Sequence, residues 1–172
     1  FEEYSLQGLI VVGGNGTMEG AHHLALEHGV PVVGIPASID NDIGLTREAI
    51  GVDTALNTIV EACDRISDTA SSHHRAFIVE VMGRNSGYLA MAASVATAAD
   101  AVLLPEHGKS PDEIVKAVVD VLRHSFDAAR EKRRVLILKA EGVEIPTEEL
   151  VDRAREEVGS DPEVEIRATI LG

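Results

Sequence analysis

Aromatic residues are scarce in this chain of 172 residues: they make up 3% of it, and Trp is absent. The hydrophobic core therefore has to be built from Val, Ile, Leu and Ala, and the overall share of hydrophobic residues is 45%. That share is typical of a globular protein and argues against an intrinsically disordered chain. At this length the chain forms one large domain or two small ones, with enough residues for a real core.

The chain also has no possible internal disulfide, no long apolar run and few basic residues. The single cysteine, Cys63, has no partner for an internal disulfide, which fits a reducing cytosol, so we expect a cytoplasmic protein. No apolar run is long enough to span a bilayer. Basic residues number 15 against 29 acidic ones, and the net charge of -14 argues against general binding to nucleic acid or to a membrane surface. A phosphorylated ligand is still compatible with this charge, because it needs only a few local Arg or Lys residues.

Short apolar runs alternate with helical patterns along the chain, as in an α/β protein. The predicted strands are residues 8–12, 31–35, 76–82, 101–104, 133–139 and 164–170. The predicted helices are residues 17–28, 53–67, 89–98, 110–132 and 147–158. The polar segment 69–74 indicates a linker and a plausible hinge between domains. This order predicts a three-layer αβα sandwich with a mostly parallel sheet, divided into parts of two domains, 1–50 and 51–172.

Polar residues follow four of the predicted strands, and in open α/β sheets ligands bind just beyond the carboxyl ends of the strands. Gly13–Thr17 combines glycines, which permit a close approach of the backbone, with a helix start, which favours an anion such as phosphate. Pro36–Asp42 carries two carboxylates, Asp40 and Asp42. Taken alone, each stretch is also compatible with an ordinary strand-to-helix turn.

The third and fourth strand ends carry an Arg and a Glu. Arg84 lies in the loop 83–87, and its planar guanidinium suits a phosphate or a phosphoryl group in transfer, although an Arg that merely closes a turn is the alternative. Glu141 follows the strand predicted at 133–139. A phosphate-binding loop, two carboxylates and an Arg, without a Ser/His/Asp arrangement or a strong metal cluster, favour phosphoryl transfer over other reaction classes.

Together these stretches resemble the 6-phosphofructokinase family. The resemblance rests on Gly13–Thr17, Pro36–Asp42 and Val79–Arg84. It is extended by Arg75 behind Ser71–His74, by Glu141–Gly142 and by Arg167–Gly172. It covers essentially the whole chain, in the same order and with similar spacing, and the Asp-bearing loop combined with Met-Gly-Arg is highly specific. The resemblance implies transfer of a phosphoryl group from ATP to the 1-hydroxyl of fructose 6-phosphate, which gives fructose 1,6-bisphosphate in glycolysis.

The resemblance also implies roles for individual residues. Asp40 would be the general base that takes the proton from the 1-hydroxyl, and Arg84 would neutralise the charge that develops on the transferred group. Arg75 and Arg167 would reach the 6-phosphate of a substrate on a neighbouring subunit, so a homo-oligomer, dimer or tetramer, is expected. The sugar-phosphate site would be lined by Ser38, Ile39, Met82, Gly83 and Glu141. The phosphates of ATP would be held by Gly14, Asn15, Gly16 and Thr17, with Mg²⁺ near Asn15 and Asp42.

Three positions differ from the family's pattern. Ser38 replaces the more common Thr, which keeps the hydroxyl. Asn15 stands where the family usually has Asp, so a bound Mg²⁺ would lose a full charge of attraction. Ala37 stands where ATP users tend to carry Gly and pyrophosphate users Lys; Ala37 and Gly16 are small and uncharged, which favours ATP as the donor.

Two alternatives stay open beside the ATP-dependent enzyme. One is a pyrophosphate-dependent phosphofructokinase, and the other is a non-catalytic half of the family that senses sugar phosphates. The family's first glycine-rich nucleotide loop and its His/Arg-bearing substrate stretch would lie outside residues 1–172. We therefore expect this chain to be the central portion of a protomer and to be inactive by itself.

Overall fold

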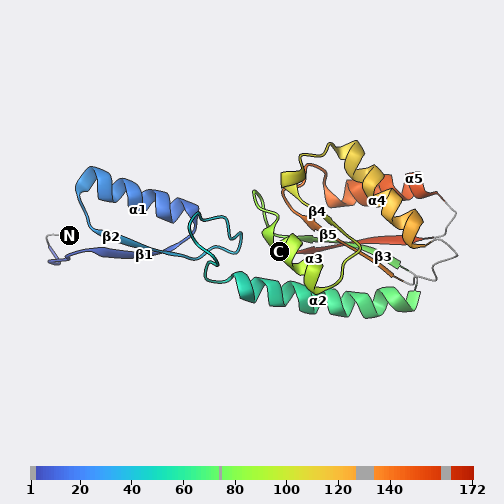
Figure 1. Cartoon of the computed structure of the whole chain (residues 1–172), viewed down its shortest axis with the longest axis horizontal. Helices are drawn as coiled ribbons and strands as arrows, with labels where there is room; N and C mark the ends of the chain where they lie inside the picture. The colour runs from blue at the N-terminus through green and yellow to red at the C-terminus, as the bar shows by residue number, and fades with distance from the viewer. Residues whose placement is uncertain (1–2, 74, 127–133, 160–163) are drawn as a thin grey trace. The chain divides into compact units, whose positions relative to one another are not determined.

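The computed structural model describes residues 3–73, 75–126, 134–159 and 164–172 (Figure 1). The chain divides into two compact units, Phe1–Asp53 and Thr54–Gly172. Each unit has its own sheet, one of two strands and one of four, and every strand pair is parallel. The predicted α/β class with parallel sheets is confirmed. Assigning a nucleotide to the first region and a sugar phosphate to the second remains a prediction.

The first unit is a strand–helix–strand arrangement. Strand β1 (Leu9–Gly13) pairs with β2 (Val32–Pro36), and α1 (Asn15–His28) connects them and ends at Gly29 in the left-handed region, at φ 66°. None of the residues of α1 is buried. Alternate residues of the two strands are also exposed: Ile10, Val12, Val33 and Ile35. Hydrophobic packing within the first unit is therefore thin.

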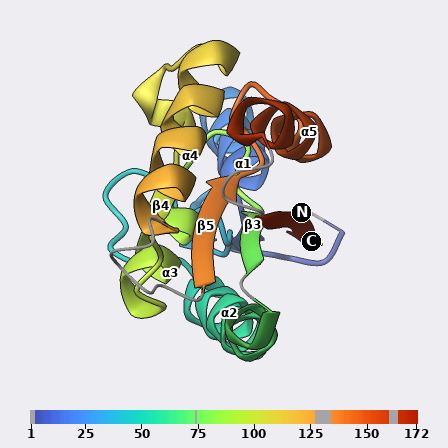
Figure 2. The ribbon, with the colours of Figure 1, turned by 90° about the vertical axis from the view of Figure 1, so that its right-hand side faces the viewer.

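The second unit holds the larger core. Its elements are α2 (Val52–His73), β3 (Arg75–Val81), α3 (Tyr88–Ala96), β4 (Ala101–Leu103), the 3₁₀ turn η1 (Pro105–His107), α4 (Pro111–Ser125), β5 (Arg134–Ala140), α5 (Thr147–Val158) and β6 (Glu165–Leu171). Helices α2 and α3 cover one face of the sheet, and α4 and α5 cover the other (Figures 1 and 2). The central strands β3 and β5 are almost wholly buried, as expected for parallel strands covered on both faces.

The predicted hinge at residues 69–74 is wrong, because α2 continues through His73. The side of the helix that faces the core extends from Ile59 and Cys63 to Ala70, which is 2% exposed. The Thr69 hydroxyl donates a hydrogen bond to the Arg65 carbonyl one turn earlier, so a polar residue is accommodated inside the helix. Burial of its apolar side therefore favours a continuous helix here, although the Ser- and Thr-rich composition of the segment predicted a linker.

Helix α4 begins where its sequence predicts. The Ser110 side chain accepts a hydrogen bond from the Glu113 N–H, the Glu113 carboxylate accepts one from the Ser110 N–H, and Pro111 occupies the first turn. The helix ends at Ser125, earlier than the end predicted near Lys132, a position that lies outside the described residues. No helix among the residues that the structure describes is both long enough and apolar enough to cross a membrane.

The strand order β4-β5-β3-β6 creates a topological switch between β5 and β3. After β3 the chain turns to α3 on one face of the sheet, whereas after β5 it turns to α5 on the opposite face (Figure 2). The helices that follow these neighbouring strands therefore lie on opposite faces of the sheet, and in open α/β sheets such a switch point is where ligands bind. Val81 lies opposite Ala140 at the carboxyl ends of the two strands.

Candidate active site

In the first unit, the glycine loop and the Asp-bearing loop lie side by side. Gly13, the last residue of β1, lies opposite Pro36, the last of β2, and the Gly13 carbonyl accepts a hydrogen bond of 2.9 Å from the Ala37 N–H. A Cβ added at Gly13 would lie 2.4 Å from the Thr17 hydroxyl oxygen, so only glycine fits there. The loop that opens α1 is thus packed tightly against its own first turn.

Asn41 shapes the loop that holds Asp40 and Asp42. Its backbone is in the left-handed region, at φ 49°, which Asn tolerates better than most residues. Its side-chain oxygen accepts a hydrogen bond of 2.9 Å from the Ala49 N–H, and its amide nitrogen donates to the Arg47 carbonyl. Asn41 was not among the predicted site residues, although its position between two aspartates was the available signal.

Asn15 and Asp42, the two residues predicted near Mg²⁺, are in contact. The Asn15 amide nitrogen donates a hydrogen bond of 2.7 Å to the Asp42 carboxylate. Within the described part of the chain, no group of three or more His, Cys, Asp or Glu residues could hold a metal ion. One carboxylate and one amide fit a cation that takes most of its ligands from phosphate oxygens and water, which is the usual mode for Mg²⁺.

In the second unit, the loops that follow β3 and β5 are held together by backbone contacts. The Glu141 N–H donates to the Val81 carbonyl at 2.9 Å, and the Gly142 N–H donates to the Gly83 carbonyl at 3.2 Å. A Cβ at Gly142 would lie 1.8 Å from the Arg84 carbonyl oxygen, so the close approach depends on glycine. The predicted site residues Met82, Gly83, Arg84 and Glu141 therefore lie at one edge of the sheet.

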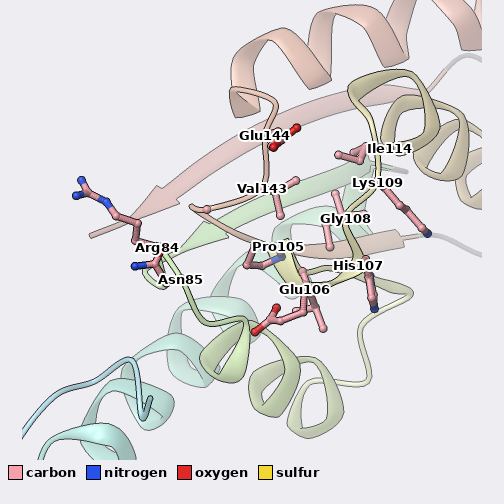
Figure 3. A pocket seen from close by; sticks show the side chains of 13 residues that line it. Arg84, Asn85, Pro105, Glu106, His107, Gly108, Lys109, Ile114, Val143 and Glu144 are labelled. Atoms are coloured by element: carbon pink, nitrogen blue, oxygen red, sulfur yellow. The ribbon is translucent and has the colours of Figure 1, made fainter. Parts of the chain in front are cut away.

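Two cavities open beside these loops. The first, of about 330 Å³, lies between the loop after β3, the turn η1 and the loop after β5. The Arg84 guanidinium points away from the other side chains that line this cavity (Figure 3). The second, of about 660 Å³, is lined by Glu80, Lys139, Glu141 and residues of the loop leading into α5. Glu141 thus belongs to a concave surface at the carboxyl end of β5.

An ion pair between a buried Lys and a partly buried Glu lies beneath this edge. The Lys139 ammonium of β5 contacts the Glu80 carboxylate of β3 at 2.9 Å, and the same carboxylate accepts a hydrogen bond from the Thr147 hydroxyl at the start of α5. Burial alone would raise the pKa of Glu80, but the hydrogen bonds from Thr147 and Lys139 and the charge of Lys139 outweigh it and hold that pKa below its ordinary value. No pattern in the sequence signals this network, because Lys139 and Glu80 become neighbours only across the sheet.

Arg75 and Arg167 meet elsewhere, toward the amino-terminal ends of β3 and β6. Both contact the carboxylate of Glu165, and the distance from Arg167 to this carboxylate is 2.5 Å. The hydrogen bonds from Arg75 and then Arg167 lower the pKa of Glu165. The structure thus joins the two arginines in one cluster and separates them, along the sheet, from Arg84 and Glu141.

The second unit has the strand order of a doubly wound α/β protein, with the Arg-bearing loop at its topological switch, and the first unit carries a glycine-rich loop that leads into a helix. The family model for phosphofructokinase matches residues 1–172, and the chain belongs to that family. A relative named ATP-dependent 6-phosphofructokinase from Thermotoga petrophila is 49% identical over 141 residues, which are 82% of this chain and 42% of the relative. A relative of the same name from Persephonella marina is 43% identical over 170 residues, which are 99% of this chain and 50% of the relative.

A solved structure of a phosphofructokinase also matches this chain. The structure of Pichia pastoris phosphofructokinase in the T-state matches with a TM-score of 0.90 and 33% identity, over 99% of this chain and 20% of that one. The chain spans about half the length, or less, of the curated relatives it matches.

Proposed function

We propose that this chain carries the catalytic residues of an ATP-dependent 6-phosphofructokinase. In the reaction, the 1-hydroxyl oxygen of fructose 6-phosphate attacks the terminal phosphorus of ATP, ADP leaves, and fructose 1,6-bisphosphate and a proton are released. The observation that carries the proposal is the junction of β3 and β5. There Arg84 and Glu141 follow neighbouring strands, in a chain that belongs to the phosphofructokinase family.

Asp40 would take the proton from the 1-hydroxyl, a role that typically contributes about 10²- to 10⁴-fold in rate. Arg84 would neutralise the charge that develops on the phosphoryl group in transfer. Ser38, Ile39, Met82, Gly83 and Glu141 would line the sugar-phosphate site. The cavity that Glu141 lines at the carboxyl end of β5 supports a binding site at this edge of the sheet, next to the loop that carries Gly83 and Arg84.

ATP would be bound by Gly14, Asn15, Gly16 and Thr17. The first turn of α1 carries no acidic residue, so no carboxylate of that turn opposes an anion at the helix N-terminus. Asn15 and Asp42 would hold Mg²⁺ together with phosphate oxygens and water. The bound cation would neutralise part of the nucleotide's negative charge.

Arg75 and Arg167 would bind the 6-phosphate of a substrate on a neighbouring subunit, so the active enzyme would be a homo-oligomer, dimer or tetramer. Their shared contact with Glu165 supports this, because the two guanidinium groups already lie in one cluster. A cytoplasmic location belongs to the same proposal. Cys63 is buried, and burial, with Asp64 nearby, raises the pKa of its thiol to about 11, as suits an unreactive reduced cysteine.

A second candidate is a sugar-phosphate-sensing half that no longer catalyses. The specific observation in its favour is the hydrogen bond from Asn15 to Asp42, because an amide has replaced one of the two carboxylates of the family's metal site. A sensor of this kind would bind fructose 6-phosphate but would gain no turnover from Mg²⁺.

The test combines a measurement of ligand binding with an activity assay. NMR titration of the 172-residue chain with ATP and with fructose 6-phosphate should shift the amides of residues 13–17 and 82–84, respectively. The chain is then completed with the remaining half of the Persephonella marina relative, and fructose 1,6-bisphosphate is measured with ATP or with pyrophosphate as donor. Turnover with ATP supports the proposal, turnover with pyrophosphate alone selects the other donor, and binding without turnover selects the sensor.

A further inference from the structure

The loop that carries Arg84 is held at both ends by contacts with other parts of the sheet's edge. At its first end, Gly83 accepts the hydrogen bond from Gly142. At its second end, Gly87 opens α3 without a side-chain cap of its own. The Gly87 N–H instead donates a hydrogen bond of 2.7 Å to the carboxylate of Glu106, which lies 19 residues further along the chain. A helix start needs such acceptors, since its first N–H groups have no partner within the helix.

The turn η1 fixes Glu106 in place. Pro105 opens this turn, and Gly108 closes it in the left-handed region at φ 58°. Backbone hydrogen bonds run from His107 to Leu104 and from Gly108 to Pro105. Figure 3 shows the Glu106 side chain pointing from η1 toward the loop that contains Asn85. The carboxylate therefore reaches the loop from a rigid element.

The contact at Gly87 leaves no spare room. A Cβ added there would lie 2.6 Å from the second carboxylate oxygen of Glu106 and 2.6 Å from a methyl carbon of Leu104. Beside it, the Ser86 hydroxyl accepts a hydrogen bond of 3.3 Å from the Tyr88 N–H. The negative charge of Glu106 at the start of α3 is also favoured by the helix dipole. Glu106 is thus a cap supplied from a distant part of the chain.

We propose that Glu106 is a positioning residue for Arg84: it anchors the far end of the loop and so holds the guanidinium where the phosphoryl group is transferred. The inference rests on the proposed function, in which Arg84 neutralises charge on that group. Arg84 lies three residues from the Gly87 anchor, so a loosened anchor displaces it. A displacement of about 1 Å in a reacting group's support can cost about 10²-fold in rate.

The test compares Glu106→Ala with two other variants. Glu106→Gln keeps an oxygen that can accept the Gly87 hydrogen bond and should rescue the loop. Glu113→Ala is the matched control, because Glu113 also accepts an N–H at a helix start, that of Ser110, but on α4 and away from the Arg84 loop. In the 172-residue chain, Glu106→Ala should speed hydrogen exchange of the Gly87 amide by about ten- to a hundredfold, as for a lost hydrogen bond to a charged acceptor.

The order parameter of the Arg84 amide decides between positioning and plain capping. It should fall from about 0.85 toward about 0.6 in Glu106→Ala and stay unchanged in Glu106→Gln and Glu113→Ala. In the completed enzyme, kcat should fall about 10- to 100-fold in Glu106→Ala with little change in KM for fructose 6-phosphate. An Arg84 amide that stays rigid in Glu106→Ala, or a loss of kcat no larger than that of Glu113→Ala, overturns the proposal. If the unmodified enzyme shows no phosphoryl transfer, the proposed function fails, and the Arg84 order parameter still decides what Glu106 does.

Discussion

Lys139 and Glu80 form an ion pair, and removing Glu80 should destabilise the second unit more than removing Lys139. Lys139 is 1% exposed, so removing its partner leaves a buried ammonium with no counter-charge. Glu80 keeps 19% exposure and the hydrogen bond from Thr147, so it tolerates the loss of Lys139 better. We therefore compare Glu80→Gln with Lys139→Met, each of which nearly preserves the side-chain volume.

The magnitudes follow from what each change leaves behind. Removing one partner of a buried pair typically costs about 3–5 kcal/mol. Glu80→Gln should lie at the upper end, about 5 kcal/mol, because an uncompensated charge stays in the interior. Lys139→Met should cost about 3 kcal/mol or less, because the remaining carboxylate keeps a donor and some water. The double variant should recover most of the loss, since no charge remains and the amide oxygen introduced by Glu80→Gln can still accept the hydrogen bond from Thr147.

Amide hydrogen exchange of β3 and β5 measures the free energy of unfolding of the second unit. The pKa of Glu80 is lowered in the folded protein, so its stabilisation is present above the ordinary carboxyl pKa and is lost as the pH falls through the lowered one. The difference in free energy of unfolding between the wild type and Glu80→Gln should therefore shrink as the pH is lowered from ~6 to ~3. Equal losses from the two single variants, or a gap that does not change with pH, would refute this reasoning.

Three further outcomes are expected. Asp40→Asn should lower turnover in the completed enzyme by about 10²-fold or more and spare binding of fructose 6-phosphate; normal turnover would remove Asp40 from the mechanism. Asn15→Asp should raise activity at low Mg²⁺, and inactivity of both forms at every Mg²⁺ level would favour the sensor. Gly142→Ala should destabilise the second unit by about 3 kcal/mol in a urea titration, because its Cβ would meet the Arg84 carbonyl at 1.8 Å. In the same titration Gly20→Ala, with nothing within 4 Å, should stabilise α1 by up to about 1 kcal/mol, and a loss as large as that of Gly142→Ala would show that crowding is not the cause.

The order and type of the elements could be read from the sequence alone, because the signals are local. Helix α5 occupies the predicted residues 147–158, and Ser110 caps α4 as its capping box predicts. Helix periodicity and caps depend on neighbours within four residues, so the chain carries them wherever it lies. The polar strand ends were found in the same way. Each follows an apolar run directly, including the loops that carry Asp40, Arg84 and Glu141.

What only the tertiary structure decided is which of these ends become neighbours. The sequence does not reveal that β3 lies between β5 and β6, and this order places the switch beside Arg84 and Glu141. The pairing of buried Lys139 with Glu80 and the remote cap of α3 by Glu106 follow from the same strand order, as pairs 59 and 19 residues apart. Such contacts depend on how the helices cover the two faces of the sheet, and no local pattern records that packing.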